Sequence, residues 1–150
     1  MKKVGLIIGI GLVGIVGVAI MTAGQMGETN HAFARGKVVL DESVRDRSQG
    51  FRTLFIIALG KDRPMPLGAF RKSIDGELKG ELYEFVLTKD SLQLMPGAMG
   101  ADFPDEFKLK ARLDQDGSAG PDQPGDVVGE IESVKKGSEG LELRINRVVE

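Results

Sequence analysis

The sequence predicts an all-β fold, an antiparallel β-sandwich of about seven strands, preceded by one N-terminal transmembrane helix. Three observations lead to this fold class. Residues 4–23 contain no charged side chain, apolar and polar residues alternate with a period of two after residue 36, and clusters of glycine and proline separate the alternating runs. The 150 residues therefore divide into a transmembrane anchor (1–24), a linker (25–36) and a β-sandwich domain (37–150).

The uncharged segment 4–23 has the length of a membrane-spanning helix. Its 20 residues would rise about 30 Å as a helix, which matches the hydrocarbon core of a bilayer. Lys2 and Lys3 precede the segment, so the positive-inside rule places the N-terminus in the cytoplasm and the remainder outside. Gly5 and Gly9 have the G-x-x-x-G spacing that permits close packing of membrane helices, although a segment so rich in glycine also produces this spacing by chance.

Two alternatives to a retained anchor come from the same region. Ala-Phe-Ala at 32–34 has the A-x-A form of a signal-peptide cleavage site, so cleavage near Ala34 is the first alternative. The apolar run is longer than the core of a typical signal peptide and ends well before this site, which favours retention. The glycines at 9, 11 and 14 match the G-x-G-x-x-G of dinucleotide-binding loops, but the following residues stay apolar where that site requires an amphipathic helix.

Seven runs after residue 36 have the length and pattern of strands. The run 53–59 is apolar throughout, which is typical of a central strand that is buried on both faces. The runs 107–113 and 141–145 alternate apolar and charged residues without interruption. The runs expected to form strands are 37–40, 53–59, 67–74, 83–87, 107–113, 126–134 and 141–145.

The composition excludes most catalytic chemistry. The chain has no cysteine and one histidine, His31 in the predicted linker, which excludes disulfides, thiolate metal sites, a thiol nucleophile and a site of several histidines. Twenty Lys and Arg against 22 Asp and Glu give a formal net charge of −2, which is unfavourable for nucleic-acid binding. We expect a binding or assembly protein with no catalytic residue, no metal and no cofactor.

Two clusters of apolar and loop-forming residues are the candidate partner-binding sites. The first cluster, at residues 65–70, fits either an exposed apolar patch or the start of an edge strand whose methionine packs in the core. The second fits either a rigid hairpin loop or a site where a peptide adds as a strand to an open sheet edge. The first cluster is Met65, Pro66, Leu67 and Phe70. The second cluster is Pro121, Pro124, Gly125 and Asp126.

Charged residues of the run 107–118 have two further interpretations. Lys108, Lys110 and Arg112 form a basic row that can meet an acidic partner, but a solvated face paired with neighbouring carboxylates is favoured. Asp114 to Ser118 resembles the start of a calcium loop, but its glycine comes too early and no glutamate occupies the twelfth position. A turn is therefore favoured there.

Short motifs follow one another in a distinctive order along the β domain. They are RPMPL (63–67), RK (71–72), FVLTKDS (85–91), MPGA (95–98), FP (103–104), KAR (110–112), DGSA (116–119), PDQPGD (121–126) and RINRVV (144–149). This order, over about residues 37–149, resembles the C-terminal immunoglobulin-like domain of the cytochrome c biogenesis family CcmI, also called CycH. The resemblance implies an immunoglobulin-like sandwich in the periplasm, and hence a single-pass protein of the bacterial inner membrane that contacts lipid through residues 4–23.

The resemblance also implies a function. The family helps to hold unfolded apocytochrome c, as a chaperone does, and passes it to the haem ligation complex. We therefore expect a membrane-anchored accessory protein of c-type cytochrome maturation that binds apocytochrome c or subunits of the haem ligation complex. The family's second membrane helix and tetratricopeptide repeats have no counterpart in this sequence. The alternative function is a non-catalytic structural subunit of a respiratory or other membrane protein complex.

Overall fold

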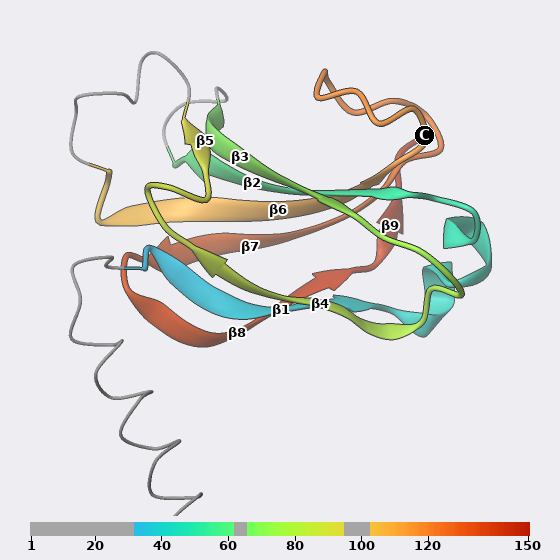
Figure 1. Cartoon of the computed structure of the whole chain (residues 1–150), viewed down its shortest axis with the longest axis horizontal. Coiled ribbons are helices and arrows are strands. Elements are labelled where there is room, and N and C mark those ends of the chain that lie inside the picture. The colour runs from blue at the N-terminus through green and yellow to red at the C-terminus, as the bar shows by residue number, and fades with distance from the viewer. Residues whose placement is uncertain (1–31, 62–65, 95–102) are drawn as a thin grey trace, which may run out of the picture. The chain divides into compact units, whose positions relative to one another are not determined.

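Two β-sheets pack face to face and enclose a hydrophobic core, which is the arrangement of a β-sandwich (Figure 1). The computed structural model describes residues 32–61, 66–94 and 103–150. The smaller sheet has the order β4-β1-β8, and the larger sheet has the order β5-β3-β2-β6-β7-β9. The strands are β1 (Ala34–Leu40), β2 (Thr53–Gly60), β3 (Pro66–Ser73), β4 (Gly80–Leu87), β5 (Gln93–Leu94), β6 (Glu106–Asp114), β7 (Val127–Lys135), β8 (Ser138–Ile145) and β9 (Arg147–Val148). Two short 3-10 helices, Glu42–Val44 and Asp46–Ser48, follow β1.

The seven predicted strands correspond to the seven long strands of the described residues. The strand β1 begins at Ala34, three residues before the predicted start, because Phe33 and Ala34 already pack on the fold. The strands β5 and β9 were not expected, since two residues are too few to show a period. The predicted all-β sandwich is confirmed for the described part of the chain.

The prediction that the sheets are wholly antiparallel is wrong for one pair of strands. The strand β1 pairs antiparallel with β4 but parallel with β8. Alternation of apolar and polar residues shows that one face is buried, but it does not distinguish the two directions. The chain between β1 and β8 forms β4 of the same sheet and five strands of the other sheet, so no hairpin turn constrains the relative direction of β1 and β8.

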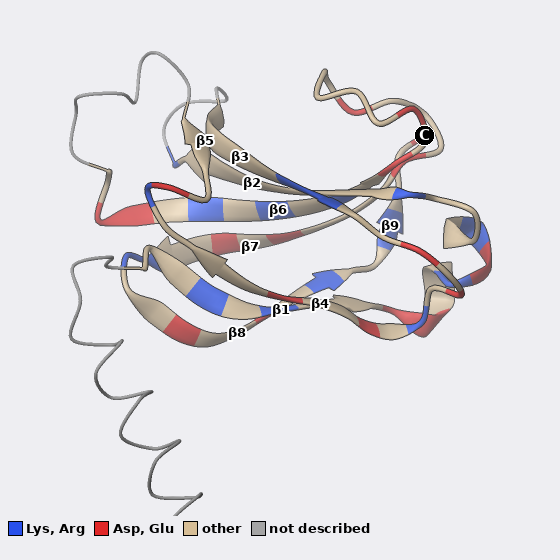
Figure 2. Cartoon of the chain, viewed as in Figure 1, with Lys and Arg blue, Asp and Glu red and all other residues tan. Residues whose placement is uncertain are grey.

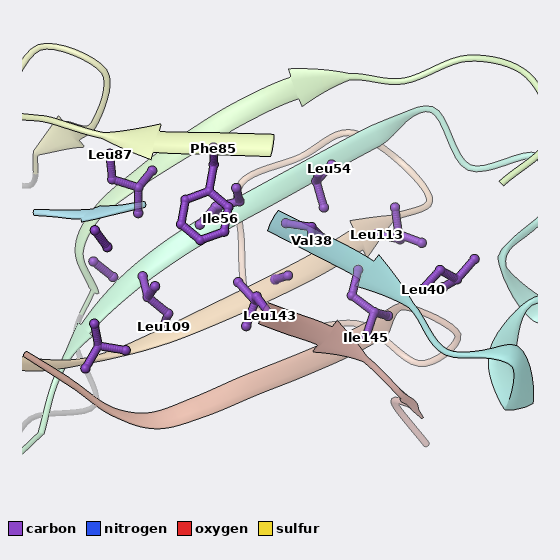
Figure 3. Close-up of a cluster of buried hydrophobic side chains, with 14 of the residues drawn as sticks. Val38, Leu40, Leu54, Ile56, Phe85, Leu87, Leu109, Leu113, Leu143 and Ile145 are labelled. Carbon is purple, nitrogen blue, oxygen red and sulfur yellow. The ribbon is translucent and has the colours of Figure 1, made fainter. Parts of the chain in front are cut away.

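Alternate residues of the long strands form the core (Figure 3). In the larger sheet, Leu54, Ile56 and Ala58 of β2 point inward beside the buried leucines of β6. The smaller sheet supplies the facing layer. Its fully or nearly fully buried side chains are Val38, Leu40, Phe85, Leu87, Leu143 and Ile145.

The other face of β2 also carries apolar side chains. Phe55 is 3% exposed, and Ile57 and Leu59 are half-buried on the outer face of the larger sheet. The prediction of a strand buried on both faces is therefore confirmed for Phe55 and holds in part for the other two. This second apolar face positions the candidate site.

Phe33 fixes the start of the described chain to the sandwich. Its ring stacks on Phe103 with 4.1 Å between ring centres, and its backbone N–H donates to Leu87 O at 2.7 Å. Within residues 32–61, 66–94 and 103–150, no helix is long and apolar enough to cross a membrane. The predicted span 4–23, with Gly5 and Gly9, lies outside the described residues.

Candidate functional site

An apolar hollow lies on the outer face of the larger sheet, on the side away from the core. Its floor includes Phe55, Ile57 and Leu59 of β2 and Ala69 of β3. Residues 119–122 form a wall over this floor, and the hollow measures about 450 Å³. This volume is within the range of sites that hold a small ligand or a few side chains of a partner.

A second hollow continues from the first. It measures about 480 Å³ and shares Phe55, Ala69 and Ala119 with it. It then extends to Arg71 at the exposed side of β3 and to the short strand β5. We call the two hollows together the outer groove, and we call residues 115–126 the β6–β7 loop.

Arg112 of β6 holds the β6–β7 loop over the sheet. Its side chain is 2% exposed and lies 3.0 Å from the carboxylates of both Asp114 and Asp122. Its terminal N–H groups donate to the carbonyl oxygens of Ser118 at 3.1 Å and Gly120 at 2.8 Å. A buried charge is tolerated where it is paired and hydrogen-bonded, so these contacts explain why a guanidinium lies beneath the loop.

The basic row on β6 is paired with carboxylates, as the favoured interpretation expects. Figure 2 shows basic positions on β6 and acidic positions on the neighbouring strand β7. Lys108 lies 3.3 Å from Glu130 and 3.4 Å from Glu132 of the neighbouring strand β7. Lys110 pairs with Asp122 of the loop. Arg112 departs from that interpretation because it is buried and not solvated, since the loop folds over it.

The acidic residues at the base of the loop hold its backbone. Asp114 accepts hydrogen bonds from the N–H groups of Asp116 and Gly117, at 3.0 and 2.8 Å, so the predicted turn is confirmed. Burial, the hydrogen bond with Asp116 and the charge of Asp126 raise the pKa of the Asp114 carboxyl. Asp126 is buried and accepts from the N–H of Gln123 at 2.9 Å. These two carboxylates therefore fix the backbone of the β6–β7 loop. Among the described residues, no group of His, Asp and Glu has the geometry of a metal site.

The structure divides the predicted partner-binding residues into four groups. Pro66 and Pro121, from the two different clusters, both line the outer groove. Leu67 and Phe70 pack against the core, and Phe70 stacks on Tyr83 with 5.6 Å between ring centres. Met65 lies outside the described residues.

The remaining three residues of the second cluster maintain the loop. The carbonyl oxygen of Pro124 accepts from Gln115 Nε2 at 3.0 Å, and the N–H of Gly125 donates to Val149 O at 2.8 Å. Gly125 has a φ of 97°, which favours glycine. With Asp126 also bound to the loop backbone, these residues set the position of Pro121.

Sequence reasoning missed the floor of the groove. The wholly apolar run 53–59 indicates that the second face of this strand is covered, but not by which segment. The sequence feature that marks the covering segment is Arg112 on β6, which is followed at close spacing by its two carboxylate partners, Asp114 and Asp122. That pattern is common in solvated turns, so the sequence does not distinguish it from an exposed ion pair.

The outer face of the smaller sheet differs from the outer groove, and many positions on its strands are charged (Figure 2). Charged side chains cover it and pair with each other, as in Lys37 with Glu81 at 3.9 Å and Arg144 with Asp41 at 3.3 Å. Exposed pairs of this kind contribute about 0–1 kcal/mol and are typical of a solvent-facing surface. Val86 of β4, 45% exposed, is the exposed large hydrophobic residue on this face.

Replacing Asp122 by asparagine is expected to destabilise the domain by about 1–3 kcal/mol at neutral pH. Burial by itself raises the pKa of Asp122, but hydrogen bonds from Lys110 and Arg112 outweigh burial and hold the pKa below its ordinary value. A carboxylate with a lowered pKa stabilises the fold fully above its unfolded pKa, and this contribution is lost as the pH falls through the folded pKa.

Urea unfolding of both proteins between pH 7 and about pH 3 measures this effect. The difference in unfolding free energy between wild type and Asp122→Asn should be greatest at neutral pH and should shrink in acid. A difference that stays constant over this range would contradict the assigned role of Asp122.

The β-sandwich domain matches a known protein family. Residues 35–146 match the family described as the cytochrome c-type biogenesis protein H Ig-like domain. No curated protein and no solved structure matches the chain.

Proposed function

The chain belongs to the cytochrome c-type biogenesis protein H Ig-like domain family, and from this premise we propose that it serves c-type cytochrome maturation as a non-catalytic binding module. The family match covers residues 35–146 and confirms the resemblance found in the sequence. Its description points to cytochrome c-type biogenesis in general. The proposal that the domain binds a polypeptide of this machinery rests on the chemistry of the domain's two outer faces.

In this role the outer groove binds a polypeptide of the maturation machinery, either apocytochrome c or a subunit of the haem ligation complex. The observation that carries this is the apolar floor beside the β6–β7 loop, where Ile57 and Leu59 are only half-buried next to the buried Phe55. An unfolded or extended polypeptide exposes apolar side chains that such a floor can cover. The outer face of the smaller sheet, with its self-paired charges, offers no comparable surface among the described residues.

The domain acts on the apocytochrome as a polypeptide and does not exchange disulfides with its cysteine thiols. The chain has no cysteine, so it has no thiol with which to exchange disulfides. Residues 4–23 anchor it in the bacterial inner membrane with the domain in the periplasm, as Lys2 and Lys3 before the segment favour. Retention of this segment is supported by Phe33 and Ala34, which pack on the fold and would be lost by cleavage after residue 34.

The test compares two variants in cells that lack the chromosomal gene. Deletion is expected to lower the amount of haem-stained c-type cytochromes, and the wild-type gene should restore it. Ala119→Arg places a long charged side chain in the groove from an exposed loop position, so it should restore little. Val86→Arg makes the same kind of change on the smaller sheet and should restore cytochromes fully.

Equal amounts of both variants in the membrane fraction would show that neither change acts through folding. Normal cytochrome levels in the deletion strain would exclude the maturation role. Copurification with an intact oxidoreductase, without apocytochrome, would favour the structural-subunit alternative. N-terminal sequencing of the purified protein checks the anchor, because a mature chain that begins at Arg35 would exclude its retention.

A further inference from the structure

We propose that the outer groove selects polypeptide segments in which a carboxylate lies close to an apolar side chain, and that Arg71 binds the carboxylate. This inference rests on the proposed function, because it names the chemistry of the partner that the groove receives. It is drawn from a difference between two arginines that flank the same aromatic residue.

Phe55 lies between Arg71 and Arg112 on the larger sheet. In the ladder, Phe55 is opposite Arg71 of β3 on one side and opposite Arg112 of β6 on the other. The guanidinium of Arg112 lies 5.0 Å from the centre of the Phe55 ring. Residues opposite one another in adjacent strands point to the same face, so both arginines belong to the outer face.

The two arginines differ in what they bind. Arg112 is buried, pairs with two carboxylates, and donates from its terminal N–H groups to two carbonyl oxygens. Arg71 is exposed and makes no ion pair or side-chain hydrogen bond with any residue of 32–61, 66–94 and 103–150. Arg112 therefore serves the fold, whereas the guanidinium of Arg71 has no such partner within the described ranges.

The position of Arg71 is at the mouth of the groove. It lines the second hollow together with Phe55, Ala69 and Ala119. One of its terminal nitrogens lies 3.4 Å from the place that a Cβ on Gly117 would occupy, so its guanidinium lies against the β6–β7 loop. A partner whose apolar side chain enters the hollow over Ala69 thus brings its neighbouring residues to this guanidinium.

The charge of the groove favours an acidic partner. Its charged lining residues are Lys110, Arg112 and Asp122 in the first hollow and Arg71 in the second, which makes three basic residues against one acidic residue. The acidic one already pairs with both Lys110 and Arg112. An arginine fork binds a carboxylate by two parallel hydrogen bonds, and the partly enclosed site strengthens them.

The carboxylate has two sources in a polypeptide, an Asp or Glu side chain and a free C-terminus. Three fluorescent peptides with the same apolar anchor distinguish them. The first contains Leu-Ala-Glu and is amidated, the second contains Leu-Ala-Gln and is amidated, and the third is the Gln peptide with a free C-terminus after Gln. Binding to the full chain in detergent is measured by fluorescence anisotropy.

The Glu peptide is expected to bind about fivefold more tightly than the amidated Gln peptide, as for an ion pair of about 1 kcal/mol. Arg71→Gln should remove this preference, and added salt should reduce it. Lys72→Gln is the matched control, because Lys72 is the next residue and lies over Tyr83, 5.5 Å from its ring centre. This control should keep the preference. If the third peptide binds more tightly than the amidated Gln peptide, the site also recognises a C-terminal carboxylate.

The outcomes separate the two proposals. If the Glu and Gln peptides bind equally to the wild type, and Ala119→Arg weakens both, the groove binds polypeptides but the role of Arg71 is wrong. If Arg71→Gln leaves the fivefold preference intact, that role is also wrong. If no peptide binds, or if all bind Ala119→Arg as well as wild type, the proposed function of the groove is contradicted.

Discussion

Replacing Arg112 by methionine is expected to destabilise the domain by about 3–5 kcal/mol, which is a large part of the stability of a domain this size. The variant keeps much of the side-chain volume but removes the charge. Asp114 is 3% exposed and would remain beneath the loop without its cation. Two carbonyl oxygens of the loop, those of Ser118 and Gly120, would also lose their donors.

Urea unfolding followed by circular dichroism measures this effect, with Lys108→Met as the matched control. Lys108 lies on the same strand, and it also pairs with two carboxylates, but it is more exposed. Its replacement is expected to cost less than about 1 kcal/mol. If the two variants lose equal stability, Arg112 has no special role in holding the β6–β7 loop.

A second large effect is expected for Gly129→Ala in β7, a loss of about 3 kcal/mol. A Cβ at this position would overlap the carbonyl oxygen of Arg144 and lie 2.8 Å from the Cα of Ile145. Both belong to the end of β8, where the chain crosses from the smaller sheet to the larger one and the N–H of Asn146 donates to Val128 O at 3.0 Å. Because the opposing atoms are backbone, they cannot give way by a change of rotamer.

Gly120→Ala is the control for this change. A Cβ on Gly120 meets nothing nearer than Ser118 Oγ at 3.9 Å. This variant should therefore change the unfolding free energy by less than about 0.5 kcal/mol. Thermal and urea unfolding of the two variants give the comparison. A Gly129→Ala protein as stable as wild type would mean that β7 and β8 do not approach as closely as described.

The fold was predictable to the extent that it depends on short-range patterns. The alternation at 107–113 and 141–145 and the apolar run 53–59 locate three strands directly, because each pattern reflects which faces are buried. The parallel pairing of β1 with β8 was not predictable, since it depends on two segments at opposite ends of the domain. The two-residue strands are defined only by their partners, so their own sequence carries no signal.

The candidate site was predictable only in part for a related reason. Pro66 and Pro121 were each identified from local composition, but their common location depends on how the β6–β7 loop folds over β2 and β3. Phe70 was identified by the same reasoning, and it faces the core because it lies opposite Ile56 and not opposite Phe55. A shift of one residue in the register moves a side chain from one face of a sheet to the other.

The central position of β1 has a consequence for the order in which the domain is completed. The strand β1, the first of the described residues, lies between β4 and β8, and its parallel partner is the last long strand to be synthesised. One edge of β1 therefore keeps unpaired backbone groups until residues 138–145 have emerged. Loop closure over nearly the whole domain precedes this pairing, which makes folding slow relative to a sandwich built from hairpins alone. A chain interrupted before β8 leaves β1 as an unpaired edge of its smaller sheet, a surface that chaperones and proteases can recognise.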